Sequence, residues 1–451
     1  MPDLNNNKIT RFSLVWPLFL ENLFRISLGN VNVLMLGSYS DKAVAAVGVS
    51  TQIINMVLML YVIVSMGSGI FISQFLGAND KRTASRVAVV SIAANLSFGL
   101  IISSLMIFFA RNLLKFMHLP EELMDYGSQY MRIVGGASFL QALIATMSAI
   151  CRNFGSTRFP MYIAFVINVI NIIGNYTVIF RPFGIPSYGI RGVAISLVIS
   201  TIIGLCLMVF FLLTRLDANL NFKDLIPFPI KILKDIVKTG APAAAESLSF
   251  STTQTITTSI ITLLGTEALT SRIYLQNIII FVFILALSIG MGTQILIGHM
   301  VGAGKIEEAY KEGNKSLKYG LISNTTLSVL LMLMRFPILS IYTRDAAIIK
   351  ISAFILVLDI FVEIGRAFNN VLANALRGAG DVRFPMMLSV SSMWGLSVPL
   401  CYILGIVFKL GLPGIWIAFA VDEWFRGIMF YRRWRSRAWQ QMRLVSDQVK
   451  V

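Results

Sequence analysis

Long apolar stretches separated by short polar breaks occupy almost all of the 451 residues of this chain. Each stretch is close to or above the ~20 residues that an α-helix needs to cross the hydrocarbon core of a bilayer. The pattern therefore predicts twelve transmembrane helices, at residues 12–37, 43–76, 87–110, 127–151, 160–180, 189–214, 237–264, 268–301, 316–341, 346–375, 384–408 and 411–431.

The two halves of the chain repeat the same features at a separation of 225 residues. The segment "CRNFGSTRFPM" at 151–161 returns as "LRGAGDVRFPM" at 376–386. Glu21 of the first stretch likewise corresponds to Glu246 of the seventh. Because each half contains an even number of spans, the two copies enter the membrane in the same direction, which is typical of parallel repeats.

We therefore expect an all-α integral membrane fold with twelve transmembrane helices in two pseudo-symmetric six-helix bundles. The predicted parts are an N-terminal lobe at 1–214, a polar cytoplasmic linker at 215–236, a C-terminal lobe at 237–431 and a basic cytoplasmic tail at 432–451.

Composition supports a membrane protein, because 56% hydrophobic and 13% charged residues are too apolar a mixture for a soluble domain. The formal charge of +16 comes from basic residues spread over many short loops, which argues against nucleic-acid binding. Their bias towards one set of loops predicts that both termini lie in the cytoplasm. We expect a multi-pass protein of a bacterial plasma membrane.

No cofactor or metal is expected. The three cysteines lie in or beside apolar segments without ligand spacing, and the only phosphate-loop-like segment, "GAGKI", has Ile306 after Lys305 instead of Ser or Thr. Two pseudo-symmetric bundles suit alternating access to a site near the midplane, and an ion gradient of protons or sodium is the remaining source of energy.

Ionisable residues inside the spans are candidates for such a site, because they are costly to keep in a membrane. Glu21 lies about ten residues into the first helix, or ~15 Å, close to the bilayer centre. The span at 346–375 places Asp359, Glu363 and Arg366 on one helical face. Two carboxylates on adjoining turns disfavour double ionisation, which suits a proton-binding site.

Structural ion pairs are an open alternative for several of these residues. Glu21 can pair with Arg25, and Asp422 with Arg426, each one turn along its helix. Arg366 can neutralise Glu363 in the same way, but Asp359 would then lack a partner.

Asparagines form a second group of candidates. Asn168, Asn171 and Asn175 share one face of an otherwise apolar span, and Asn32 lies at a comparable depth in the first helix. Buried amides need partners, so we expect a mutual network, which serves either a site or helix packing.

Five ordered segments carry a wider resemblance: "NVNVLMLGSYSDKAVAAVGVSTQI", "GIFISQFLGANDKRTASR", "CRNFGSTRFPMYIAFVINVINIIGNY", "GIRGVAISLVIS" and "ALRGAGDVRFPM". Together they resemble the multidrug and toxic compound extrusion (MATE) family of cation-coupled efflux transporters over residues 12–430. The resemblance implies a two-lobed, twelve-helix antiporter, not an enzyme, that expels organic, often cationic compounds in exchange for protons or sodium. We expect it to work as a monomer on small-molecule substrates.

The chain departs from the family where coupling is often placed. Asn32 and Asn175 stand where members of the family have Asp, and a neutral amide cannot exchange a proton; Asn171 matches the family. In the second lobe, Arg366 and Phe250 lie near the positions of an Asp and a Glu of another branch.

By elimination, we expect Glu246, Asp359 and Glu363 to face a shared interior cavity and at least one of them to carry the coupling proton or contact a cationic substrate. The other candidates for the coupling site and substrate cavity are Arg366, Glu21, Asn32, Asn171 and Asn175. A lipid-linked saccharide flippase of the same superfamily is the alternative function, although its anionic substrate would favour a more basic cavity.

Overall fold

The computed structural model describes residues 11–180, 188–216 and 220–445, and these ranges contain helices and no strands. The remaining residues, which include parts of the predicted lobes, linker and tail, lie outside the described ranges. The chain divides into two compact units, unit 1 (Met1–Ile72 and Asp80–Ala241) and unit 2 (Ser73–Asn79 and Pro242–Val451).

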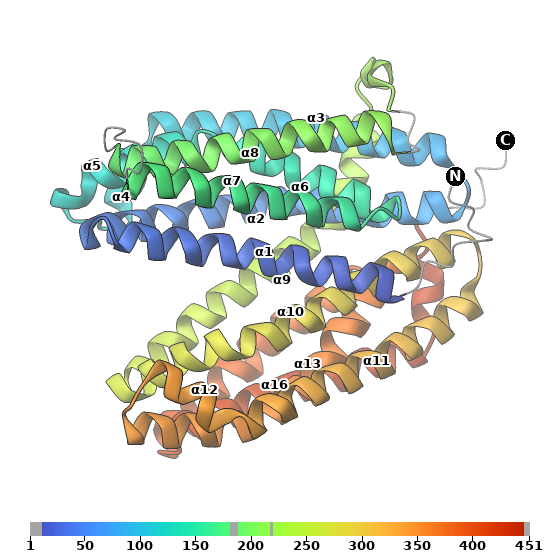
Figure 1. Ribbon diagram of the computed structural model, residues 1–451. Coiled ribbons are helices and arrows are strands. Elements are labelled where there is room, and N and C mark those ends of the chain that lie inside the picture. Colours follow the sequence, from blue (N-terminus) through green and yellow to red (C-terminus); the bar gives the residue numbers. More distant parts are fainter. Residues whose placement is uncertain (1–10, 181–187, 217–219, 446–451) are drawn as a thin grey trace. The chain divides into compact units, whose positions relative to one another are not determined.

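Within the described ranges, each half of the chain forms eight α-helices, and those of the first half are shown in blue to green in Figure 1. They are α1 (Arg11–Gly37), α2 (Asp41–Gly77), α3 (Lys81–Phe108), α4 (Ala110–Phe116), α5 (Glu121–Tyr130), α6 (Ser138–Asn153), α7 (Arg158–Phe180) and α8 (Gly189–Thr214). A π-helical segment, η1 (Met131–Gly135), joins α5 to α6, and a 3-10 turn, η2 (Phe222–Leu225), follows α8.

The second half forms another eight α-helices. They are α9 (Ile230–Thr262), α10 (Thr266–Gly302), α11 (Ile306–Leu333), α12 (Arg335–Tyr342), α13 (Ala346–Gly378), α14 (Arg383–Ser392), α15 (Val398–Tyr402) and α16 (Gly411–Arg435). The π-helical segments η3 (Met393–Ser397) and η4 (Ile403–Val407) continue α14 and α15 as one span, and a 3-10 turn, η5 (Ala438–Met442), follows α16.

The twelve predicted spans are confirmed. Six are single helical segments long and apolar enough to cross a membrane, and two are pairs bent at a break, α5–η1 with α6 by 41° and α11 with α12 by 67°. The other four are α1, α9, α13 and α16. These four helices contain the candidate charged residues, so polar side chains lower the hydropathy of the helices that hold the site.

Helix bounds repeat with the 225-residue offset seen in the sequence. Residues 81–108 form α3 and 306–333 form α11, while residues 41–77 form α2 and 266–302 form α10. The duplication therefore extends from sequence motifs to individual helix ends.

One pair of repeated spans differs in shape. Gly135 ends η1 and Gly136 lies in the break before α6, whereas the equivalent Ile360 and Phe361 lie inside the continuous helix α13. Paired glycines permit a kink that β-branched and aromatic residues do not favour. In unit 2 the equivalent span is consequently a helix without a break, and this helix contains charged residues.

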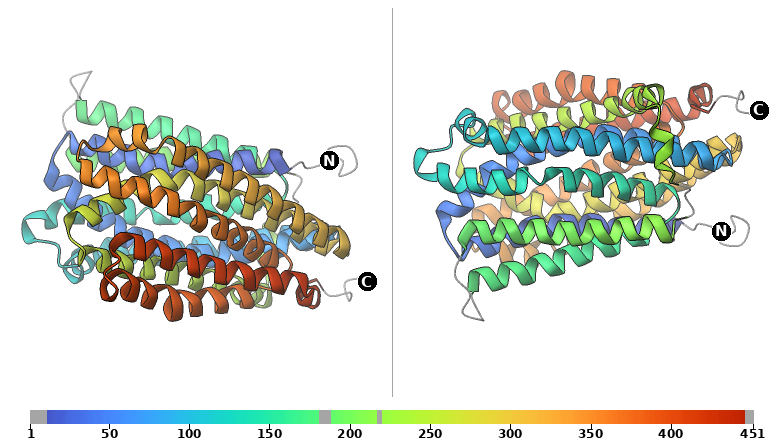
Figure 2. Two further views of the ribbon diagram at one scale, coloured as in Figure 1. Left: turned by 90° about the horizontal axis from the view of Figure 1, so that it is seen from below. Right: turned by 90° about the horizontal axis from the view of Figure 1, so that it is seen from above.

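Within each unit the helices pack side by side around an apolar core. In unit 1, α1 contacts α7, α7 contacts α8, and α6 contacts both α3 and α8. In unit 2, α13 contacts α10, α11 and α16, and lies among them in the views of Figures 1 and 2. Since α13 is surrounded by helices, its polar face is directed into protein instead of lipid.

Candidate functional site

A cluster of buried charges joins α13 to α16 in unit 2. Glu363 forms an ion pair with Arg366 one turn along α13. The Nε atom of Arg366 also lies 3.5 Å from Oε1 of Glu423, and Nη2 of Arg426 lies 3.2 Å from the same oxygen. Glu423 is therefore shared between two arginines from different helices.

Glycine permits this close approach of the two helices. A Cβ atom at Gly365 of α13 would lie 3.0 Å from the Cβ atom of Glu423, tighter than ordinary van der Waals contact. The missing side chain thus brings the carboxylate of Glu423 within reach of α13, where Asn369 Nδ2 donates a 2.7 Å hydrogen bond to its Oε2 atom.

The cluster continues along α16. Arg426 Nη2 lies 2.6 Å from Oδ2 of Asp422, and the hydroxyl of Ser392 donates to Oδ1 of the same carboxylate. The alternative pairing of Asp422 with Arg426 is therefore present, but within a larger network that includes Glu423.

Asp359 has a different set of partners. Its Oδ1 atom accepts a 3.0 Å hydrogen bond from the indole Nε1 of Trp416. The guanidinium of Arg272 lies 5.5 Å from the centre of the Trp416 ring, a cation–π distance, and donates a 2.6 Å hydrogen bond to Gln254. Asp359 thus has a neutral direct partner and a cation on the far side of the indole.

Formal charges within this cluster do not balance. Its four acids, Asp359, Glu363, Asp422 and Glu423, are each 6% exposed or less. The neighbouring cations are Arg272, Arg366 and Arg426. With every group ionised, the cluster has one more negative than positive charge, and an uncompensated buried charge is costly.

One carboxylate oxygen of the cluster has no hydrogen-bond partner. Oε2 of Glu363 is buried without a donor among the described residues, although Oε1 of the same side chain is paired with Arg366. A proton on Oε2 would remove the excess charge at the place where the carboxylate is least stabilised.

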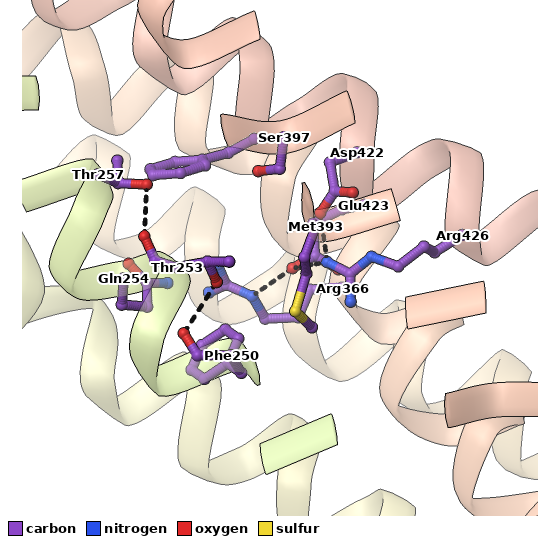
Figure 3. Close-up of a pocket in the computed structure, with 11 residues that line it drawn as sticks. Phe250, Thr253, Gln254, Thr257, Arg366, Met393, Ser397, Asp422, Glu423 and Arg426 are labelled. Atoms are coloured by element: carbon purple, nitrogen blue, oxygen red, sulfur yellow. Dashed lines mark hydrogen bonds and ion pairs between the residues drawn. The ribbon is translucent and has the colours of Figure 1, made fainter. Parts of the chain in front are cut away.

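A small polar cavity of about 30 Å³ adjoins the cluster. Figure 3 shows Arg366, Glu423 and Arg426 on one side of it and Thr253, Gln254 and Thr257 of α9 on the other. The remaining lining residues are Phe250, Met393, Ser397, Phe419 and Asp422. Its wall holds two acids and two arginines, and hydroxyl and amide groups face them.

The structure differs from the expectation that Glu246, Asp359 and Glu363 share a cavity. None of them lines the cavity in unit 2, whereas Arg366 does. The physical reason is that each acid is engaged elsewhere: Glu246 with Arg377, Glu363 with Arg366 and Asp359 with Trp416.

Glu246 and Glu21 occupy equivalent positions, as the repeat predicts. Nη1 of Arg152 lies 2.6 Å from Oε1 of Glu21, and Arg377 forms the same ion pair with Glu246. Acid and base are 131 residues apart in both cases. Arg25 also pairs with Glu21 at 3.3 Å, as the structural alternative for that residue requires.

The three predicted asparagines meet in unit 1. Asn175 Nδ2 donates to Oδ1 of Asn32 at 2.6 Å and to Oδ1 of Asn171 at 3.2 Å. Asn168 donates instead to the backbone carbonyl of Ala164 in its own helix. The predicted approach of Asn32, Asn171 and Asn175 is thus confirmed, and their network is made of neutral groups.

Comparison with known sequences identifies the family. The MatE family profile matches residues 17–177 and 242–403, one match in each half of the chain. The chain belongs to the MATE family. Members of this family are multi-pass membrane transporters and not enzymes.

Two relatives align over nearly the whole chain. The "Uncharacterized transporter YisQ" of Bacillus subtilis (strain 168) is 41% identical over 430 residues, covering 95% of this chain and 94% of the relative. The "Probable multidrug resistance protein NorM" of Thermotoga maritima is 28% identical, covering 94% of this chain and 92% of the relative.

Solved MATE structures have the same fold. "Crystal structure of MATE in the bent conformation" superposes with a TM-score of 0.88 at 19% identity, covering 96% of both chains. A transporter from Pyrococcus furiosus, described under "Reverse polarity of binding pocket suggests different function of a MOP superfamily transporter", gives a TM-score of 0.85 at 20% identity and 95% coverage of both chains.

Sequence reasoning missed several residues of this MATE site. Spacing along the helix pairs Asp422 with Arg426 and gives no partner for the adjacent Glu423, because sequence spacing reveals partners only within a helix. Arg272 and Arg377 reach their partners from other helices. Two adjacent acids inside an apolar span were the available signal, since a single ion pair leaves the second acid unexplained.

Proposed function

We propose that this chain is a secondary active efflux transporter, which exchanges organic, often cationic compounds for protons by alternating access. It works as a monomer in a bacterial plasma membrane with both termini in the cytoplasm. The relatives named as multidrug resistance proteins support the substrate class. The observation that carries the coupling step is the excess of one acid over the arginines in the buried cluster of unit 2.

Glu363 is the coupling acid in this proposal. Protonation of its unpartnered oxygen neutralises the excess charge of the cluster. Loss of that proton restores one net negative charge, which a bound organic cation compensates. The proton and the cationic substrate therefore compete to neutralise the same excess negative charge, as an antiporter requires.

Arg366 transmits this change to the cavity. Its guanidinium contacts both Glu363 and Glu423, and it also lines the cavity. When Glu363 is protonated, Arg366 loses one of its two carboxylate partners and interacts more strongly with Glu423, a cavity acid. The cavity is then less attractive to a cation, so proton loading favours substrate release.

The asparagine network of unit 1 supports the choice of unit 2. Asn32, Asn171 and Asn175 hydrogen-bond to one another and contain no group that titrates near neutral pH. Protons are favoured over sodium because an arginine or indole donor already binds one oxygen of each of the four acids, which leaves fewer free oxygens than a metal ion needs.

The test compares gradient-driven efflux in everted vesicles. Glu363→Gln should abolish ethidium transport driven by an imposed pH gradient and should bind the dye in detergent more weakly than the unaltered protein, with the pH dependence of binding lost. Glu267→Gln is the matched control in the same unit, since Glu267 is exposed in the first turn of α10. Efflux driven by a sodium gradient alone, or unchanged efflux by Glu363→Gln, contradicts the proposal.

A further inference from the structure

A second pocket of unit 2 lies at the bend between α11 and α12, and its lining differs from that of the polar cavity. It is an open groove of about 420 Å³ between the short helix α12 and the first turns of α13. Figure 1 shows these two segments side by side at one end of the unit. Basic side chains and an apolar floor line it together.

The basic residues of this groove are Arg335, Arg344 and Lys350. None of them forms an ion pair with another described residue. Arg335 is held at the bend, because its Nη1 atom donates 2.7 Å to the carbonyl of Met332 and its guanidinium lies 4.8 Å from the centre of the Phe336 ring. Three cations thus face one groove without protein counter-ions.

The equivalent corner of unit 1 is charge-compensated. There, Arg111 of α4 forms an ion pair with Asp125 of α5. The 225-residue offset places Phe336 at the position of Arg111 and Lys350 at the position of Asp125. At these two positions unit 2 has a phenyl ring and a cation in place of the ion pair, and its remaining acid, Asp345, caps the start of α13. The groove of unpaired cations is therefore specific to one copy of the repeat.

The groove residues of α13 are ordered by depth. Ala346, Ile349, Lys350, Ala353, Phe354 and Val357 follow the i, i+3, i+4, i+7 spacing of a single helical face. Lys350 lies four residues below the start of the helix, or ~6 Å, which matches the thickness of a headgroup layer. Val357 lies eleven residues below it, or ~16 Å, at the depth of acyl chains.

We propose that this groove binds an anionic phospholipid. The phosphate is held by Arg335, Arg344 and Lys350, and an acyl chain lies along Ala353, Phe354 and Val357. Cations over an apolar strip match the order of charge and hydrocarbon in one lipid molecule. A soluble anion would use the cations but would leave the strip uncovered, and Phe354 is 53% exposed.

The experiment is native mass spectrometry of delipidated protein titrated with phosphatidylglycerol or with phosphatidylcholine of the same acyl chains. The first phosphatidylglycerol should bind more tightly than the first phosphatidylcholine. Arg344→Gln with Lys350→Gln should weaken phosphatidylglycerol binding about 30-fold, about fivefold for each cation, and leave phosphatidylcholine binding unchanged. Both residues are exposed, so neither change disturbs a core.

A matched control removes two exposed cations from the equivalent corner of unit 1. Arg111→Gln with Lys115→Gln changes the net charge equally and should retain phosphatidylglycerol binding. Ala346→Trp narrows the groove at its exposed mouth without changing charge and should weaken phosphatidylglycerol binding. An equal loss in the control, or no loss in the double variant of unit 2, overturns the proposal. Competition by inorganic phosphate as effective as that by the lipid assigns the groove to a free anion and overturns it as well.

Discussion

The ion pair that both units repeat should be a stabilising element, and its removal gives the sharpest test of the packing. Arg377→Met removes the cation beside Glu246 while keeping an apolar side chain of similar reach. The two side chains are only 11% and 14% exposed. Leaving a buried carboxylate without its partner costs about 3–5 kcal/mol.

The equivalent change in unit 1 should cost less. Arg152→Met leaves Glu21 with a second cation, since Arg25 lies 3.3 Å away, whereas Phe250 occupies the equivalent position in unit 2. The Arg25 side chain is 63% exposed, so its interaction contributes only about 0–1 kcal/mol. We expect Arg152→Met to be milder than Arg377→Met by about that amount.

Thermal unfolding of the purified protein in detergent measures both effects. A loss of 3–5 kcal/mol corresponds to a drop in Tm on the order of 10 °C for a unit of about 200 residues. The double variant Glu246→Gln with Arg377→Met should recover most of this loss, because no unpaired charge remains. If the losses of stability caused by Glu246→Gln alone and by Arg377→Met alone add up to the loss in the double variant, Glu246 and Arg377 do not interact and the reasoning is wrong.

Three further changes test other parts of the structure. Asn32→Asp places a carboxylic acid in the amide network of unit 1 and should make transport more pH-dependent; an unchanged pH profile would remove any coupling role from that network. Trp439→Ala should cost about 3–5 kcal/mol, measured by thermal unfolding, because the ring is fully buried and stacks 4.4 Å from the centre of Trp434. Gly365→Leu should abolish proton-driven efflux by forcing α13 away from Glu423, while Gly395→Ala, at a position with open space, should not.

The architecture could be predicted from sequence because it depends on features that extend over many residues. Apolar runs of membrane length give the spans, and two copies of one motif give the repeat and its offset. The approach of Asn32, Asn171 and Asn175 was also predictable, since buried amides on one face need partners and the family resemblance connects two distant helices.

The charge cluster could not be fully predicted, because its partners come from different helices. Spacing along α13 identifies Glu363 and Arg366, but only packing shows that Glu423 of α16 also contacts Arg366. The interaction of Asp359 with the indole of Trp416 has no pattern in the sequence. Burial, which decides the cost of each charge, is likewise a property of the assembled helices.

The difference between the two copies of the repeat supports the proposed proton-binding role of Glu363. The repeat equivalent of Glu363 is Ser138, a buried hydroxyl that lies 3.1 Å from the hydroxyl of Tyr61 and 3.0 Å from that of Ser103. Hydroxyls satisfy one another without any net charge, so this position in unit 1 is stable at every physiological pH. If this position had only a structural role in both copies of the repeat, we would expect a neutral network in both. Unit 2 instead has a carboxylate with one unpartnered oxygen at that position, beside an arginine that reaches the cavity. A buried carboxylate costs more free energy than the hydroxyl at the equivalent position of unit 1. This cost is explained if unit 2 performs the proton-dependent step and unit 1 has a structural role.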